Sequence, residues 1–192
     1  DLMMGRKIGC LAAVEPDAGS DATSVQASAV LDGDEWILNG NKSWITNATV
    51  SSHSVVLCQT DKTKGTKGIA TFIVENDAPG YSRVKIGHKL GCRSSDTGQL
   101  FFRDCRIPKA NLLGVIGQGM KIALTCIEHT RFGISFMALG VTRACLEASI
   151  QYAQERKQFG KPIGSFQLVQ EKIAQMAVDY EASKWLSYHV AF

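Results

Sequence analysis

The segment VEPDAGSD, at residues 14–21, has the composition of a turn that could hold a ligand. A proline, small residues, a glycine and a serine follow a run that reads as a strand, so backbone N–H groups can converge there without side-chain bulk. Converging donors of this kind suit an anionic or carbonyl-rich ligand. The same residues are common in turns that bind nothing. The segment therefore predicts either a ligand loop or an ordinary turn.

A second candidate is NKSWITNA, at residues 41–48, where Trp44, Ile45 and Thr46 follow one another on a predicted strand. A flat aromatic wall with a hydroxyl nearby could stack on a planar heterocycle and hydrogen-bond to its edge. The alternative is an ordinary tryptophan on the face of a strand. Composition alone leaves both interpretations open.

Several other kinds of site are not indicated. There is no P-loop and no G-x-S-x-G motif. Gly117-Gln118-Gly119 lacks the third glycine of a dinucleotide-binding loop, because Ile122 stands in its place. We predict no metal site, since the histidines lack the spacing of metal ligands. The histidines are His53, His88, His129 and His189.

The six cysteines contain no C-x-x-C pair, which argues against a zinc site or a disulfide framework. We predict reduced thiols that are mostly small core residues. They are Cys10, Cys58, Cys92, Cys105, Cys126 and Cys145.

The composition, 45% apolar and 20% charged, is that of a soluble globular protein. The net charge of +3 is small and its lysines and arginines are scattered, so we predict no nucleic-acid partner. No apolar run reads as a bilayer span or a signal peptide, so no membrane partner is predicted either. The chain starts without methionine and ends in a predicted helix, and we expect it to be part of a longer protein.

The elements that would position these residues change in type along the chain. Short runs rich in β-branched and aromatic residues alternate with glycine, aspartate and asparagine clusters in the first part. Asp32-Gly33-Asp34 predicts a hairpin, and Asn39-Gly40 predicts a turn between two strands. The predicted strands cover residues 7–14, 27–31, 35–38, the run from the Asn39-Gly40 turn to Ile45, and residues 54–59, 68–75, 82–86 and 99–103. Such a pattern favours an antiparallel barrel or sandwich.

Helical periodicity takes over after Pro108. Residues 118–156 contain no proline and predict a helix, with a break near residues 130–133 as an alternative. A second helix is predicted from Ser165, its expected N-cap, after the loop at residues 160–164. The predicted apolar faces are Ile134, Met137, Val141, Ala144, Ala148 and Tyr152 on the first helix, and Phe166, Val169, Ile173, Met176 and Tyr180 on the second. We therefore predict an α+β chain with a barrel-like β domain at residues 1–113 and helices of a four-helix bundle at residues 114–192.

Five separated motifs together resemble the acyl-CoA dehydrogenase family. E-P-x-x-G-S-D followed by N-G-x-K-x-W-I-T-N matches the family's flavin and acyl-CoA contact loops. KLGCRSSDT, CRIPKANLLG and ERKQFGKPIGSFQLVQ follow in the family's order, at residues 89–97, 105–114 and 155–170. The resemblance covers essentially the whole chain, with similarity to short-chain, branched-chain and glutaryl members. It implies the middle β domain and the first helices of the C-terminal bundle, in a homotetramer that binds FAD.

The resemblance also assigns roles to residues. Trp44 would pack on the isoalloxazine ring, the Thr46 hydroxyl would bond near flavin N5, and Ser20 would touch both ligands. Arg156 and Gln167 would reach the FAD of a neighbouring subunit. The implied FAD-binding residues are Leu11, Ala12, Ala13, Val14, Glu15, Pro16, Asp17, Ala18, Gly19, Ser20, Trp44, Ile45, Thr46, Arg156 and Gln167. The implied acyl-CoA contacts are Ser20, Glu128, His129, Thr130 and Arg131.

The implied reaction is α,β-desaturation of an acyl-CoA. A glutamate would remove the α-proton, the β-hydrogen would pass to flavin N5, and electrons would go to an electron-transferring flavoprotein. Thr130 stands where some branches carry that glutamate, so we expect the base beyond Phe192. Val14 stands where the family often has threonine or serine. The alternatives are a non-catalytic flavin or CoA-thioester binding module and an oxidase. The implied compartment is the mitochondrial matrix or the bacterial cytoplasm, and a short or branched acyl chain is favoured.

Overall fold

The runs of β-branched and aromatic residues in the first part of the chain form one mixed sheet. A computed structural model describes residues 1–191 and assigns eight strands to this sheet. The strands are β1 (Gly9–Ala12), β2 (Ser28–Asp32), β3 (Glu35–Thr46), β4 (His53–Gln59), β5 (Ile69–Glu75), β6 (Tyr81–Lys85), β7 (Thr97–Pro108) and β8 (Leu112–Leu113). Short 3-10 helices, η1 (Lys62–Gly68) and η2 (Lys109–Asn111), precede β5 and β8.

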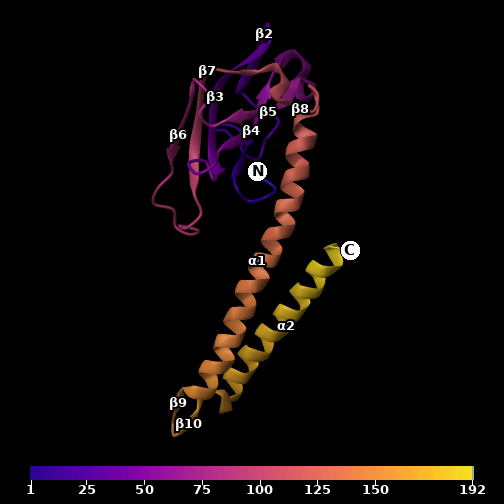
Figure 1. The fold of residues 1–192 in the computed structure, drawn as a ribbon. Coiled ribbons are helices and arrows are strands. Elements are labelled where there is room, and N and C mark those ends of the chain that lie inside the picture. The colour runs from indigo at the N-terminus through magenta and orange to yellow at the C-terminus, as the bar shows by residue number, and fades with distance from the viewer. Residues whose placement is uncertain (192) are drawn as a thin grey trace. The chain divides into compact units, whose positions relative to one another are not determined.

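The strand order is β6-β7-β3-β2-β4-β5-β8, with β1 pairing to β4 (Figure 1). Most neighbours are antiparallel, but β1 and β2 both pair with β4 in parallel. The α+β class is confirmed, whereas the sheet is open and mixed rather than an antiparallel barrel. Turn signals reveal hairpins between consecutive strands, but they cannot reveal a parallel pairing, which needs a longer crossover.

One of the two predicted turns is confirmed. Asp32 pairs with Glu35 across a tight hairpin in which Gly33 has a φ of 61°. The turn predicted at Asn39-Gly40 is wrong, because β3 runs through it as a single strand. Asn39 instead faces a bulge in β7, where its side-chain amide donates to Asp104 Oδ1 (3.0 Å) and its Oδ1 accepts from the Asp104 N–H (2.8 Å).

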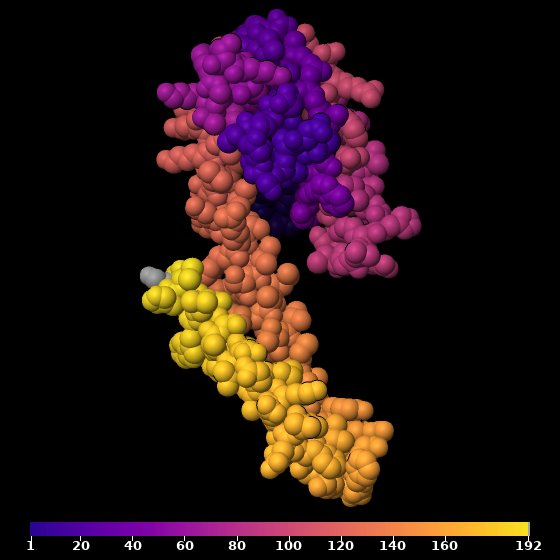
Figure 2. Space-filling view, turned by 180° about the vertical axis from the view of Figure 1, so that it is seen from behind, coloured from indigo at the N-terminus to yellow at the C-terminus, as the bar shows by residue number. Residues whose placement is uncertain are grey.

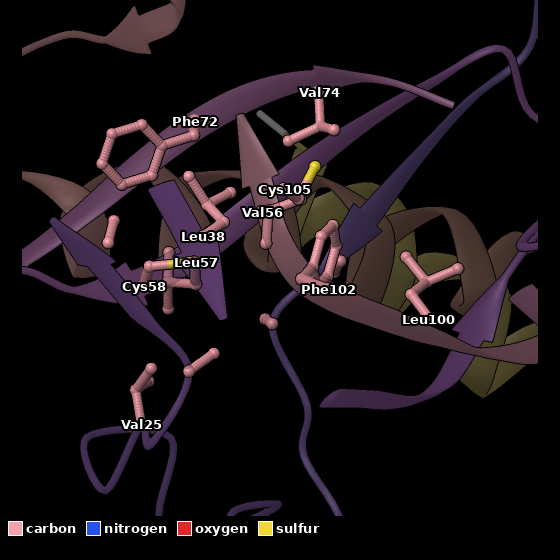
Figure 3. Packing of buried hydrophobic residues seen from close by; sticks show 14 of the residues in the cluster. Val25, Leu38, Val56, Leu57, Cys58, Phe72, Val74, Leu100, Phe102 and Cys105 are labelled. Carbon is pink, nitrogen blue, oxygen red and sulfur yellow. The ribbon is translucent and has the colours of Figure 1, made fainter. Parts of the chain in front are cut away.

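The core of the sheet unit is made by inward-facing residues of β3, β4, β5 and β7, as Figure 3 shows for Leu38, Val56, Phe72 and Phe102. In β4 and β5 the burial is continuous at residues 56–59 and 69–72, so these central segments are covered on both faces. The Trp36 ring meets the Phe72 ring edge-on, with centroids 5.1 Å apart. This packing gives the strands beside it a rigid base.

Two helices follow the sheet: α1 (Gly119–Glu155) and α2 (Gln167–Ala191). Between them lie the hairpin of β9 (Lys157–Gln158) and β10 (Lys161–Pro162) and the 3-10 helix η3 (Ile163–Ser165). The prediction of a helix over residues 118–156 is confirmed, and α1 continues through residues 130–133 without a break. The chain separates into two units, Asp1–Thr125 and the part that begins at Cys126. Ser165 does not cap α2, because its hydroxyl donates to the Pro162 carbonyl (2.7 Å).

In the second unit, α2 runs antiparallel to α1 (Figures 1 and 2). The face predicted for α2 is confirmed as its more buried side. The face predicted for α1 is wrong, since Ile134, Met137, Val141 and the residues that continue it are exposed. Within this unit the half-buried residues of α1 are instead Ile127, Phe136, Leu139, Leu146 and Ser149, and Ala153 is buried. Apolar residues occupy two faces of α1, and periodicity alone cannot tell which face meets α2.

Helix α1 is also long and apolar enough to cross a membrane by length and composition. It has 37 residues, and its most apolar window has a mean hydropathy of 1.2 with no buried residue. The prediction that no segment would be long and apolar enough to span a bilayer is therefore wrong. Bundle helices of soluble proteins meet the same criterion, so the finding alone does not indicate a membrane span.

All six cysteines are free, and they divide evenly between core and surface: Cys10, Cys58 and Cys105 are buried, whereas Cys92, Cys126 and Cys145 are exposed. The prediction that most are core residues therefore holds for only half of them. Burial raises the pKa of the Cys58 thiol to about 12 and that of Cys105 to about 11, so neither forms the reactive thiolate at neutral pH.

We expect an aromatic disulfide reagent to label three thiols in the folded chain and all six after unfolding. Absorbance of the released thiolate counts them. A Cys92→Ser variant should lower the native count by one and leave the buried class unchanged. Labelling of more than three thiols without denaturant would contradict the burial of Cys10, Cys58 and Cys105.

Candidate functional site

A bulge in β3 sets the orientation of the candidate tryptophan. Lys42 pairs with Leu100 and Ile45 with Gly98, so two residues of β3 stand opposite one residue of β7. The extra residue lets Lys42 and Ser43 both point inward, and it turns Trp44 outward with a φ of 59°. A left-handed backbone is costly for a bulky residue and persists only where the surroundings fix it.

Trp44 and Thr46 consequently share the outer face of β3. The Trp44 side chain is 62% exposed, and Thr46 is exposed as well. The Thr46 hydroxyl makes no hydrogen bond to another residue of the described chain. Ile45 lies between them with its side chain in the core, so only its backbone could face a ligand. The aromatic wall and the hydroxyl donor expected from the sequence are thus present on one surface.

The loop at residues 14–20 lies directly beside this bulge. The Ser43 N–H donates to the Val14 carbonyl at 2.9 Å, which joins the loop to β3. Glu15 and Ala18 pair with each other through their backbones. The N–H groups of Gly19 and Ser20 have no hydrogen-bond partner within residues 1–191, and both residues are exposed. The loop therefore keeps donors free for a ligand.

Only some of the other residues that the resemblance assigns to FAD in and before this loop point into the protein. Ala12, Ala13 and Ala18 are buried, Leu11 and Val14 are half-buried, and Pro16 and Asp17 are exposed. Glu15 is 5% exposed, and its carboxylate is fully engaged inside the unit. It accepts hydrogen bonds from the N–H groups of Gln26 (2.8 Å) and Ala27 (3.0 Å) and from Lys42 Nζ (2.8 Å). Glu15 therefore shapes the loop from within.

Asp96 holds the turn that follows Thr46. Its Oδ2 accepts the Thr49 N–H and its Oδ1 accepts the Thr49 hydroxyl, each at 2.7 Å, while its carbonyl accepts the Asn47 N–H at 3.0 Å. Burial alone would raise the pKa of Asp96, but the Thr49 hydrogen bonds and the nearby Lys85 and Lys89 outweigh it and hold the pKa below its ordinary value. Ionised Asp96 thus stabilises the strand end that carries Thr46.

We expect Asp96→Asn to lower the free energy of unfolding by about 1.5–3 kcal/mol at neutral pH, as for hydrogen bonds to a charged group. Because the folded pKa is lowered, this stabilisation is complete above the unfolded pKa of about 3.9 and is lost as pH falls through the folded pKa. Urea unfolding at a series of pH values should show that the free energies of unfolding of the wild type and of Asp96→Asn become equal in acid. Asp34→Asn, the same change at an exposed position, should leave the free energy of unfolding at neutral pH unchanged. If the difference in free energy of unfolding between the wild type and Asp96→Asn stayed constant into acid, the charge of Asp96 would not contribute to stability.

In the second unit, Glu128 and Arg131 lie one helical turn apart on α1 and line the same groove. The groove has a volume of about 360 Å³ and is completed by Phe132 and Ser135 of α1 and by Leu186, Ser187 and Val190 of α2. His129 and Thr130 do not line it, since neighbours on a helix face different directions. The Thr130 hydroxyl donates to the Cys126 carbonyl at 2.9 Å. The four residues of α1 that were expected to contact acyl-CoA are therefore divided between two sides of the helix.

Arg156 and Gln167 stand at the same end of the helix pair. The Arg156 carbonyl accepts the Ile163 N–H at 2.8 Å, which ties the end of α1 to the segment just before α2. Both side chains are exposed, and the Arg156 guanidinium forms no ion pair with any described residue. Both therefore remain available to a ligand or a second chain. No metal-binding cluster of histidine, cysteine, aspartate or glutamate occurs in the described part of the chain.

Family models match both parts of the chain. Residues 10–105 match the middle domain of acyl-CoA dehydrogenases, and residues 117–192 match their C-terminal domain. The chain belongs to the acyl-CoA dehydrogenase family. Its resemblance to short-chain and glutaryl members is confirmed by the individual relatives below.

Relatives of the family share most of this chain. It is 44% identical to the mitochondrial short-chain specific acyl-CoA dehydrogenase of Mus musculus, over 97% of the chain and 45% of that protein. Butyryl-CoA dehydrogenase from Megasphaera elsdenii superposes with a TM-score of 0.94 at 39% identity, over 98% of this chain and 49% of that one. A glutaryl-CoA dehydrogenase from Mycobacterium smegmatis, solved in complex with FADH2, gives a TM-score of 0.90 at 40% identity, over 98% and 47%. The chain spans about half the length of the relatives it matches.

Three residues that organise this candidate site were not individually predicted from the sequence. Lys42 pairs with Glu15, Ser43 binds the loop through its N–H, and Asp96 anchors the turn after Thr46. A signal for Lys42 existed, because it follows Trp36 and Leu38 at the inward-facing positions of the same strand. A charged residue at such a position needs a buried partner.

Proposed function

We propose that this chain carries the FAD and substrate contacts of an acyl-CoA dehydrogenase that desaturates an acyl-CoA thioester between its α and β carbons. The observation that carries the proposal is the exposed face of Trp44 and Thr46, joined to the loop at residues 14–20 by the bond between Ser43 and Val14. Further support comes from the family and from a relative solved with FADH2.

The first unit offers the chemistry that a flavin needs. The Trp44 ring would stack on the isoalloxazine plane, and the Thr46 hydroxyl would donate a hydrogen bond at its N5 edge. The free N–H groups of Gly19 and Ser20 would bind polar atoms of the cofactor or of the thioester. When bound, FAD would supply the acceptor for the two electrons and the β-hydrogen.

Residues of the second unit would complete the ligand contacts. The Arg156 fork matches a pyrophosphate bidentately, and with Gln167 it would reach the FAD of a neighbouring subunit in a homotetramer. Glu128 and Arg131 would contact the CoA part of the substrate from their shared groove, with His129 and Thr130 nearby. We assign the α-proton abstraction to a glutamate beyond Phe192.

The remaining assignments complete this proposal. The acyl chain would be short or branched, and electrons would leave through an electron-transferring flavoprotein. Relatives occur in mitochondria and in bacteria, so the protein would work in the mitochondrial matrix or the bacterial cytoplasm. The middle domain would end at Leu113 and the C-terminal domain would begin at Gly114, in keeping with the limits of the two family matches.

Anaerobic titration of the full-length parent protein with butyryl-CoA and glutaryl-CoA tests the function. Loss of the flavin absorption band would support a dehydrogenase. A perturbed band without bleaching would favour a non-catalytic binding module, and peroxide release in air would favour an oxidase. A parent protein that is bleached by no acyl-CoA would contradict the proposal.

Thr46→Val should slow flavin reduction about 10²-fold, the cost of removing one donor that stabilises developing charge. Valine keeps the shape of threonine but has no hydroxyl, whereas Thr46→Ser keeps the hydroxyl and should retain most of the rate. Stopped-flow reduction under anaerobic conditions measures both variants. Equal rates for the valine and serine variants would show that the hydroxyl does not act on the flavin.

A further inference from the structure

The two flavin-contact segments of the first unit are linked inside the protein by an ion pair. Lys42 Nζ donates to Glu15 Oε1 at 2.8 Å, with side-chain exposures of 0% and 4%. It also donates to the Ala13 carbonyl at 3.4 Å. The carboxylate of Glu15 receives two further N–H groups, from Gln26 and Ala27. The pair therefore fastens β3 to the start of the loop at residues 14–20 and, through Glu15, to the residues just before β2.

A second link lies one residue away from the ion pair, before Glu15 on the loop and after Lys42 on β3. The Val14 carbonyl, next to Glu15, accepts the N–H of Ser43, which follows Lys42. These adjacent links fix the backbone immediately before Trp44, whose left-handed conformation requires support from its surroundings. On the other segment they fix the start of the turn that leads to Gly19 and Ser20.

Stability alone does not explain an ion pair in this position. A buried pair can often be replaced by apolar residues of similar volume without loss of stability, because desolvation offsets the attraction. A fixed geometry between two segments is a better-attested benefit of such a pair, and here the segments are those that would contact one cofactor.

We propose that Glu15 and Lys42 are positioning residues for the flavin: their ion pair holds the loop at residues 14–20 and the Trp44–Thr46 face as one preorganised surface. Neither side chain reaches the ligand, since both are enclosed in the unit. The inference rests on the proposed function only in taking FAD as the ligand of this surface.

The test uses the full-length parent protein and four variants. They are Lys42→Met, Glu15→Gln, the double variant, and Ile107→Ala as a control. Ile107 is buried at the opposite end of the β3–β7 ladder, so its truncation lowers stability without touching the surface. FAD affinity is measured by equilibrium binding, the environment of the isoalloxazine by flavin absorption and fluorescence, and stability by thermal unfolding.

The double variant separates positioning from stability, because it removes both charges and leaves neither unpaired. We expect it to unfold close to the temperature of the wild type but to bind FAD at least about tenfold more weakly, the effect seen when outer partners of a site are removed. Its flavin fluorescence should rise as contact with Trp44 loosens. Ile107→Ala should lose stability and keep its FAD affinity and spectrum.

Recovery of both stability and FAD affinity in the double variant would overturn the proposal and leave the pair a purely structural one. Weakened FAD binding in Ile107→Ala equal to that of Lys42→Met would also overturn it. A wild-type protein that holds FAD but is not reduced by acyl-CoA would refute the dehydrogenase function alone. A wild-type protein with no affinity for FAD would refute both.

Discussion

Replacing Lys42 by methionine should lower the free energy of unfolding of this chain by about 3–5 kcal/mol. Methionine fills most of the space of the lysine stem but leaves the carboxylate of Glu15 enclosed without its cation. A buried charge that loses its partner keeps the full cost of its desolvation. Urea unfolding followed by circular dichroism measures the loss.

A second lysine in an ion pair, Lys64, serves as the control for the effect of burial on stability. Lys64 forms an ion pair with Asp61 at 3.2 Å, but both side chains are exposed, so Lys64→Met should cost no more than about 1 kcal/mol. Adding Glu15→Gln to Lys42→Met should recover most of the stability, because no charge then remains unpaired. Equal losses for the Lys42 and Lys64 variants would mean that the interior pair is as hydrated as a surface one.

Gly40→Ala should destabilise the chain by about 3 kcal/mol or more, from overpacking together with backbone strain. Gly40 has a φ of 138°, which side chains rarely adopt, and an added Cβ would lie 2.7 Å from both Cα and Cβ of Ala27. Ala27 cannot move freely, because its N–H is bound to the carboxylate of Glu15. Chemical denaturation of the variant gives the free-energy difference.

Gly33 offers the control for this substitution. It has a φ of 61°, but an added Cβ there would meet no atom within 4 Å. Gly33→Ala should therefore cost only about 1–2 kcal/mol, the strain of a left-handed alanine. If Gly40→Ala cost no more than Gly33→Ala, Ala27 would not approach β3 as closely as the structure has it.

The order of elements followed from local patterns, which is why most of it could be predicted. The hairpin at Asp32-Gly33-Asp34 and the long helix over residues 118–156 each depend on neighbours in the sequence. The pairing of β1 with β4 and the failure of Asn39-Gly40 to turn depend on contacts with distant strands. No local signal carries that information.

The candidate site likewise has features that could be predicted from the sequence and features that depend on distant strands. Trp44 and Thr46 could be singled out by residue type, and their roles in flavin binding stay predictions. Strand alternation places both on one face, but which face it is depends on a bulge against β7 that the sequence does not reveal. The inward position of Glu15 was missed because the motif that contains it reads as one continuous loop, whereas its carboxylate is bound by Lys42 from another strand.

The β3–β7 ladder contains two bulges whose register shifts cancel. At Asn39 the extra residue lies in β7, and at Ser43–Trp44 it lies in β3, so the pairs beyond both irregularities return to the original frame. Only the pairs from Gly40 to Lys42 have a register that differs by one residue from that of the rest of the ladder. Deleting the extra residue at either irregularity would remove that bulge and leave the pairs on both sides of it unchanged, so Trp36 and Thr46 would keep their faces. A deletion between Trp36 and the first irregularity would instead turn Trp36 to the opposite face. We therefore expect a one-residue deletion to be tolerated better at these two irregularities than elsewhere in β3 and β7.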